Sequence, residues 1–192
     1  MLIYLPPVTA LVVSIMLWVA IGFISGYCAH RLPLDRIDHD TWLTRPREFE
    51  DEGRFYERHL RIRLWKDKVP EKGDMFKGGY SKRELPGSSD HDLERFAAET
   101  RRAEVVHWLN AGSGPFFVLW CGPVLAFFML VVGACHLPFV MIQRYNRARI
   151  DRTLARRRVR RGWPTGSSRQ LPAYGSPADS PPPDPTSPPA PA

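Results

Sequence analysis

The stretch PVTALVVSIMLWVAIGFISGYCA, residues 7–29, contains no residue with a formal charge. A second stretch, residues 112–143, also lacks Asp, Glu, Lys and Arg, and only His136 within it can carry a charge. A helix needs about 20 apolar residues to cross the roughly 30 Å hydrocarbon core of a bilayer. Both stretches reach this length, so the sequence predicts a mainly α-helical protein of the cell membrane with two apolar membrane helices.

The two stretches divide the chain into five segments. The charged segment between them is expected to lie on the membrane surface and to have mixed secondary structure. Pro, Ser and Ala dominate the C-terminal segment, which cannot bury enough apolar surface to fold and is predicted to be disordered. The predicted segments are a first transmembrane helix (1–30), an interfacial or soluble functional segment (31–111), a second membrane segment (112–143), a basic juxtamembrane segment (144–162) and a disordered Pro-rich tail (163–192).

The positive charge of the chain is concentrated at one place. Ten arginines and three aspartates follow Gln143, so this region accounts for the whole net charge of +7. A basic cluster next to a membrane segment is typical of the cytoplasmic side, where anionic lipids attract it. The bilayer therefore explains these arginines, and we predict no nucleic-acid partner.

The path of the chain through the membrane is left open by the sequence. Residues 1–7 carry no charged side chain and Tyr27 precedes Cys28, so we expect the first stretch to be a retained anchor and not a secretory signal. Prolines at 123 and 138 interrupt the second stretch. A single tilted and kinked span fits best, and a re-entrant hairpin is the alternative, which would put residues 31–111 and the basic segment on the same side.

The segment between the apolar stretches contains several local signals. His59–Trp65 alternates polar and apolar residues, which predicts a half-buried strand. Lys72–Gly87 is rich in glycine and turn formers and is expected to be a loop. Ser89 has the properties of a helix N-cap, and acidic residues follow it, so we predict a helix that continues to about Leu109.

This predicted helix contains the best candidate for chemistry. Glu104 and His107 are three residues apart, so a carboxylate can contact an imidazole on one helix face. Such a carboxylate orients the ring and raises its basicity, as a general base requires. His107 precedes Phe116 by about 13 Å along a helix, which puts it near the bilayer surface. The alternative is a surface helix with ordinary ion pairs, such as one between Arg101 and Glu104.

Metal and nucleotide signatures are missing from the sequence. The three cysteines have no C-x-x-C spacing, and a single E-x-x-H motif lacks the second copy that a carboxylate-bridged metal pair needs. We therefore predict no metal site and no bound cofactor. Cations gather after residue 65, and Lys66 and Lys82 are candidates for binding the phosphates of a carrier such as coenzyme A; solvation and lipid contact are the alternative.

Four motifs in order carry a family resemblance. The chain resembles the glycosyl-4,4'-diaponeurosporenoate acyltransferase family, which consists of small membrane enzymes of staphyloxanthin-type carotenoid synthesis. The resemblance covers about residues 54–152. It depends on Trp65–Pro70, on Phe76–Gly79 with Lys82–Arg83, on Glu99–Glu104 with His107–Trp108, and on Gln143–Arg147.

The resemblance implies transfer of a fatty acyl group from an acyl thioester, acyl-CoA or a similar donor, to a sugar hydroxyl of a lipid-borne glycosylated carotenoid. It implies no assigned catalytic residues, so the roles follow from the helix geometry above. His107 is predicted to take the proton from the hydroxyl and Glu104 to orient His107. Arg101 or Arg102 is predicted to face the developing oxyanion. Predicted substrate-binding residues are Lys66, Asp67, Lys82, Glu99 and Asn146.

The identity of the acceptor and two other functions stay open at this point. The long Pro-rich tail departs from the family pattern, so the acceptor can also be another glycolipid or membrane alcohol. A non-enzymatic membrane-anchored interaction protein would use the basic segment and the tail to recruit partners. A metal-dependent membrane oxidase would use Glu104 and His107 as ligands.

Overall fold

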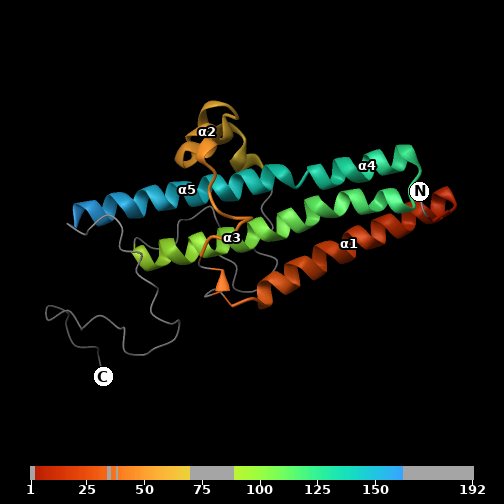
Figure 1. Ribbon diagram of the computed structural model, residues 1–192, viewed down its shortest axis with the longest axis horizontal. Coiled ribbons are helices and arrows are strands. Elements are labelled where there is room, and N and C mark those ends of the chain that lie inside the picture. Colours follow the sequence, from red (N-terminus) through yellow and green to blue (C-terminus); the bar gives the residue numbers. More distant parts are fainter. Residues whose placement is uncertain (1–2, 34–35, 38, 70–88, 162–192) are drawn as a thin grey trace, which may run out of the picture.

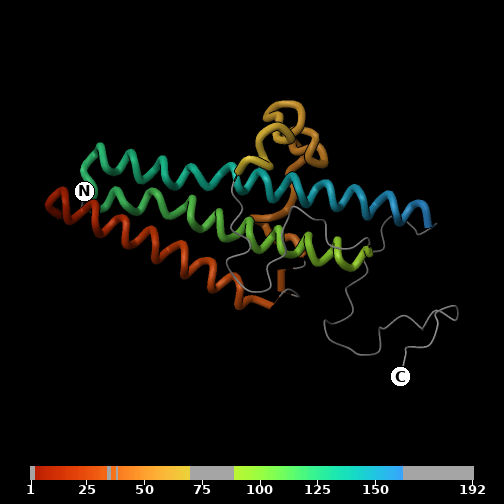
Figure 2. The backbone as a smooth tube through the Cα atoms, turned by 180° about the vertical axis from the view of Figure 1, so that it is seen from behind, coloured from red at the N-terminus to blue at the C-terminus, as the bar shows by residue number. Residues whose placement is uncertain are grey.

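Three long helical rods lie side by side in the computed structural model, which describes residues 3–33, 36–37, 39–69 and 89–161. They are α1 (Pro7–Arg31), α3 (Asp90–Ser113) and the consecutive pair α4 (Pro123–Ala134) and α5 (Leu137–Arg160). α3 lies between α1 and the α4–α5 rod in both views (Figures 1 and 2). The predicted start of α3 is confirmed, because Ser89 Oγ accepts a hydrogen bond of 3.1 Å from the Asp92 N–H.

The second apolar stretch folds back on itself. A short 3₁₀ helix, η6 (Gly114–Leu119), continues α3, the chain turns at residues 120–122, and α4 returns alongside. Glycines permit this close packing: a Cβ on Gly133 would lie 3.0 Å from the Ala111 carbonyl oxygen and 3.2 Å from Gly114 Cα. The second apolar stretch therefore has the shape of a hairpin, and its path through a membrane stays a prediction. It brings the start of α3 and the end of α5 to the end of the bundle where α1 finishes (Figure 2).

Residues 40–69 cover the outer side of α5. They form η2 (Glu48–Gly53), α2 (Arg54–Arg58), η3 (Ile62–Leu64) and η4 (Lys66–Lys68), and they pack on α5 through a cluster of Tyr56, Ile62, Ile142 and Tyr145. Figure 1 shows this group on the side of α5 away from α1.

The strand predicted for His59–Trp65 is wrong. Arg61 adopts a left-handed conformation with φ +46°, and a turn bond of 2.9 Å joins the Leu64 N–H to the Arg61 carbonyl. The described residues contain no strand with which this segment could form a ladder. The alternating pattern instead reflects a short turn that buries Ile62 against α5 and leaves Leu64 exposed.

The prediction of a mainly α-helical chain is confirmed for the described residues. By length and composition, two stretches are able to cross a membrane: Pro7–Arg31, and Pro123–Arg160, which contains α4 and α5. Both have large apolar side chains on their outer faces, among them Val8, Met16, Val124 and Phe127. The predicted loop at Lys72–Gly87, with Lys82, and the predicted tail at 163–192 lie outside the described residues.

Candidate functional site

A cluster of buried charges joins α3 to α5. We call Glu50, Glu104, Arg144 and Arg147 the charge cluster. Arg144 Nε donates to one oxygen of Glu104 at 2.6 Å, and Arg147 donates to the other oxygen at 2.6 Å. Arg144 also forms an ion pair with Glu50, so both guanidinium groups and both carboxylates have partners of opposite charge. Buried charges need such pairing, and Glu104 is completely buried.

Backbone carbonyls and an aromatic hydroxyl complete the charge cluster. Arg144 donates to the Leu43 carbonyl at 2.6 Å, and Arg147 donates to the Thr44 carbonyl. Burial is the main cause that raises the pKa of Tyr56, and the negative charge of Glu50 raises this pKa further. Tyr56 therefore stays protonated. The hydrogen bonds from the two arginines to the carbonyls of Leu43 and Thr44 attach the segment before η2 to α3 and α5.

A pair of histidines lies next to the charge cluster, toward the apolar end of the bundle. His107 Nδ1 on α3 is 3.3 Å from Nδ1 of His136, which occupies the break between α4 and α5. Phe139 stacks on His107 with ring centroids 4.7 Å apart. On the other side, Trp18 of α1 stacks on His136 at 6.1 Å and on Phe117 at 5.0 Å. Residues from all three rods therefore meet at this histidine pair.

The histidine pair lies at a boundary between two kinds of surface. In α3, charged residues occupy most of the turns before His107, and from Ala111 through η6 the chain has no charged residue. Both rings are half-buried. An imidazole takes up a proton near neutral pH, so a site at this boundary can act on a molecule with a polar head and an apolar body.

The other residues predicted from the sequence lie in separate places. Arg101 Nε donates to Asp40 at 2.7 Å. Arg102 pairs with Glu99 at 3.1 Å and donates to the Leu32 carbonyl just after α1 at 2.6 Å. These contacts connect α3 to the chain that follows α1, and a role for either arginine at an oxyanion stays a prediction.

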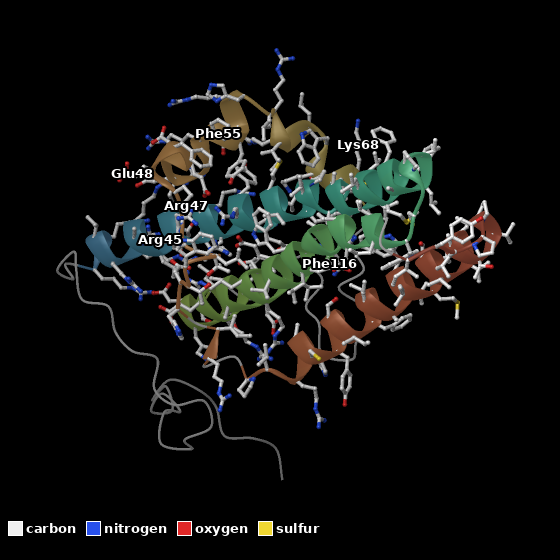
Figure 3. All side chains as sticks on the ribbon, turned by 45° about the vertical axis from the view of Figure 1, so that its right-hand side comes forward. Arg45, Arg47, Glu48, Phe55, Lys68 and Phe116 are labelled. Carbon is white, nitrogen blue, oxygen red and sulfur yellow. The ribbon has the colours of Figure 1, made fainter. Side chains whose placement is uncertain are left out.

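Lys66, one of the two predicted donor-binding residues, is on the outer side of α5. Lys66 forms an ion pair with Asp67 in η4. Figure 3 shows Lys68 of the same turn on this side, with Arg45, Arg47 and Glu48 grouped farther along α5. The latter three line a shallow hollow with Pro46 and Phe49. Asn146 is half-buried on α5, and its substrate-binding role stays a prediction.

Sequence reasoning missed the most important partners in this region. Glu104 was expected to orient His107, but its oxygens receive hydrogen bonds from Trp108, Arg144 and Arg147. Its orienting role therefore stays a prediction. His136 was recognised as a costly polar residue in an apolar stretch, which is a signal for a partner but does not identify that partner. The described residues contain no group of three or more His, Cys, Asp or Glu side chains arranged to bind a metal ion.

Comparison with known proteins identifies the family. Residues 39–156 match the sequence model of the family described as glycosyl-4,4'-diaponeurosporenoate acyltransferase. Proteins of that name from Staphylococcus aureus strains bovine RF122 / ET3-1 and USA300 are 27% identical over 141 residues, and the one from strain Newman is 26% identical. Each alignment covers 72% of this chain and 84% of the relative. No solved structure matches the chain. The match extends over more than half of the residues, so the chain belongs to the glycosyl-4,4'-diaponeurosporenoate acyltransferase family and is an acyltransferase.

Proposed function

We propose that the chain is a membrane-embedded enzyme that moves a fatty acyl group from an acyl thioester to a sugar hydroxyl of a glycosylated carotenoid or a similar lipid. The names of its relatives support this class of acceptor. The observation that carries the proposal is the histidine pair at the boundary between the polar and apolar parts of the bundle. A glycolipid presents its sugar at this depth while its apolar body stays among the helices.

The proposed membrane position follows from the distribution of side chains. α1 and the hairpin of η6 and α4 expose large apolar residues. Residues 7–29 and 112–143 contain no Asp, Glu, Lys or Arg. These parts lie in the bilayer, and the first arginines of α5 lie among the headgroups. The hairpin keeps residues 31–111 and the basic end of α5 on the same side. The arginines at the end of α5 favour the cytoplasm, so both segments face it in this proposal.

The proposed reaction is a direct transfer. The hydroxyl oxygen attacks the thioester carbonyl carbon, its proton goes to the imidazole of His107, the C–S bond breaks, and the proton then passes to the departing thiolate. A reaction of this kind depends on positioning and on stabilisation of the oxyanion, and it needs no enzyme nucleophile and no cofactor. Lys66 and Lys82 bind the phosphates of the donor in this proposal. Asp67, Glu99 and Asn146 contact the substrates.

A reconstituted assay tests the proposed function. The purified full chain in liposomes is given radiolabelled acyl-CoA and a glycosylated carotenoid, and the ester product is separated by chromatography. We expect product with the wild-type protein and a loss of about 10²- to 10⁴-fold for His107→Ala, the range of general-base catalysis. His59→Ala is the matched control, because His59 is exposed on the outer side of α5. Wild-type rates in folded His107→Ala would contradict the base assignment, and absence of product with every thioester donor would contradict the transfer.

A further inference from the structure

Three arginines of α5 differ from the others in their surroundings. Five of the eight arginines in this helix form ion pairs with carboxylates of the described residues: Arg144, Arg147, Arg152, Arg157 and Arg158. Arg149, Arg156 and Arg160 form no ion pair with any described carboxylate, and all three are exposed. We call these three residues the arginine stripe.

The arginine stripe lies on one face of the helix. Arg156 follows Arg149 by seven residues and precedes Arg160 by four, so the three side chains lie within about 40° of one another around α5 and extend about 16 Å along it. Tyr145, one turn before Arg149, is on the same face, and the guanidinium of Arg149 lies 5.7 Å from the centre of its ring. Because residues 40–69 cover Tyr145, the stripe begins at the edge of this covering group and continues along the outer side of α5.

The far end of the stripe extends beyond the lipid headgroups in the proposed membrane position. The end of α1 is level with the charge cluster, because Arg102 of α3 donates to the Leu32 carbonyl and lies only two residues before Glu104. From Arg147, α5 continues for thirteen residues, or about 20 Å, to Arg160. Figures 1 and 2 show α5 running past the end of α1. The headgroup layer is about 5–8 Å thick on each side of a bilayer, and the field of its charges decays over about 8 Å in physiological salt. Lipid therefore accounts for the first arginines of α5 but not for the end of the stripe.

The spacing of the stripe fits an acidic protein surface better than a small anion. A phosphate group is bound by donors that converge on it, as in a bidentate guanidinium contact. The charges of the stripe instead lie along a line of about 16 Å, so they match carboxylates spread over a partner surface of similar length, such as an acidic helix. Complementary charges of this kind steer a soluble partner to its site and fix its orientation.

We propose that the arginine stripe docks an acidic, water-soluble carrier protein that delivers the acyl group as a thioester on a flexible phosphopantetheine arm. Acyl thioesters are carried by coenzyme A or by proteins of this kind, and only the protein presents an extended acidic face. The stripe leads along the outer side of α5 to the group that contains Lys66, which the proposed function assigns to a donor phosphate. The identity of the cargo rests on the proposed function, and the docking itself does not.

A binding measurement tests the docking without any reaction. The full chain in phosphatidylcholine nanodiscs is titrated with a purified acyl carrier protein charged with a palmitoyl group, and Kd is measured by interferometry. We expect the combined variant Arg149→Gln, Arg156→Gln, Arg160→Gln to raise Kd about 10-fold, as for the loss of three exposed ion pairs. The wild-type Kd should rise between about 0.01 and 0.15 M salt, where the Debye length falls from about 30 to about 8 Å, and the Kd of the variant should change less.

A second variant with the same loss of charge is the matched control. Arg31→Gln, Arg36→Gln, Arg45→Gln removes three exposed arginines outside α5 and should bind the carrier protein as the wild type does. Helix content by circular dichroism should be the same in all three proteins, since no arginine of the stripe pairs with a described carboxylate. Equal losses of binding in the two combined variants, or no binding by the wild type, would overturn the docking.

Kinetics with two donors separate the carrier protein from coenzyme A. With the palmitoyl carrier protein as donor, we expect the stripe variant to raise KM about 10-fold and to leave kcat nearly unchanged, because the stripe does not touch the reacting atoms. With palmitoyl-CoA, both constants should stay at their wild-type values.

Three outcomes of these experiments would overturn the proposal. An equal rise in KM for palmitoyl-CoA would make the stripe a phosphate site, and transfer from palmitoyl-CoA alone would exclude the carrier protein as donor. If phosphatidylglycerol in the nanodiscs raised the unfolding temperature of the wild type but not of the stripe variant, with carrier binding unchanged, the partner would be lipid. If the wild type transfers no acyl group from either donor, the proposed function fails, while the titration still decides the docking.

Discussion

The two ends of the helical bundle are held together by different forces. At the polar end, α3 and α5 are joined by ion pairs from Glu104 to both arginines of the charge cluster, from Asp90 to Arg157 and from Glu94 to Arg158. At the apolar end, α3, η6 and α4 approach through Gly114 and Gly133, and stacked rings fill the space beside α1.

The difference teaches how each end achieves a defined structure. In the membrane position proposed above, apolar contacts between helices give little preference, because lipid tails are as apolar as the side chains, so small residues and close packing decide the arrangement. At the polar end, paired charges favour an alignment of α3 and α5 in which the buried charges of the charge cluster have partners of opposite sign. The histidine pair lies between the two ends, where both kinds of constraint fix its geometry.

Removal of a charge at the polar end should have the largest effect. Glu104→Leu leaves Arg144 and Arg147 without their shared carboxylate in a buried site. We expect a loss of about 3–5 kcal/mol in the free energy of unfolding, as for other buried pairs that lose one partner. Denaturant unfolding in detergent, followed by circular dichroism, measures it.

An exposed acidic residue provides the control for this variant. Glu52→Leu removes a carboxylate that pairs with Arg54 at 3.6 Å on the surface, and we expect it to cost less than about 1 kcal/mol. If Glu104→Leu were no more destabilising than Glu52→Leu, the charge cluster would not hold the polar end together.

A single methyl group should disturb the apolar end to a smaller extent. Gly133→Ala places its Cβ against the backbone of Ala111 and Gly114, which cannot rotate away. We expect a loss of about 1–3 kcal/mol from this overpacking. Gly112→Ala has no atom within 4 Å of the new Cβ, and the higher helix propensity of alanine should stabilise it by about 0.5–1 kcal/mol. Equal unfolding free energies for the two variants would contradict the close packing.

Acid should loosen the polar end and not the apolar end. The hydrogen bond from Arg157 holds the pKa of Asp90 below its usual value, and so does the nearby Arg161. The contribution of Asp90 to the free energy of unfolding is therefore complete above the pKa of Asp90 in the unfolded chain. It is lost as the pH falls through the lower pKa of Asp90 in the folded chain. We expect about 0–1 kcal/mol less stability at acid pH, and a smaller pH dependence in Asp90→Asn. Unfolding curves recorded across this range measure it, and identical curves for the two proteins would exclude Asp90 as the titrating group.

Local signals in the sequence predicted local structure well. The Ser89 cap, the helix that follows it and the long helix over residues 7–29 are all present, because caps and apolar runs act over one or two turns. The sequence could not show that the second apolar stretch turns back on itself. This turn depends on the close approach of Gly114 and Gly133, which the spacing of prolines does not reveal.

Partners distant in sequence could not be predicted. Glu50 and Arg144 are separated by 94 residues, and each looks like an ordinary surface charge until the chain folds. The contact between His107 and His136 depends on the turn at residues 120–122, which brings α4 back beside α3. The strand at His59–Trp65 failed for the same reason, since alternation alone does not show whether a neighbouring strand exists.

The return of the chain at residues 120–122 has a consequence for membrane asymmetry. Embedded as proposed, an enzyme whose polar surfaces all face one compartment meets its donor and its acceptor in the same leaflet. The new ester is then formed where the sugar already stood, and the enzyme transports nothing across the bilayer. Any appearance of the product in the opposite leaflet would require a separate lipid flippase.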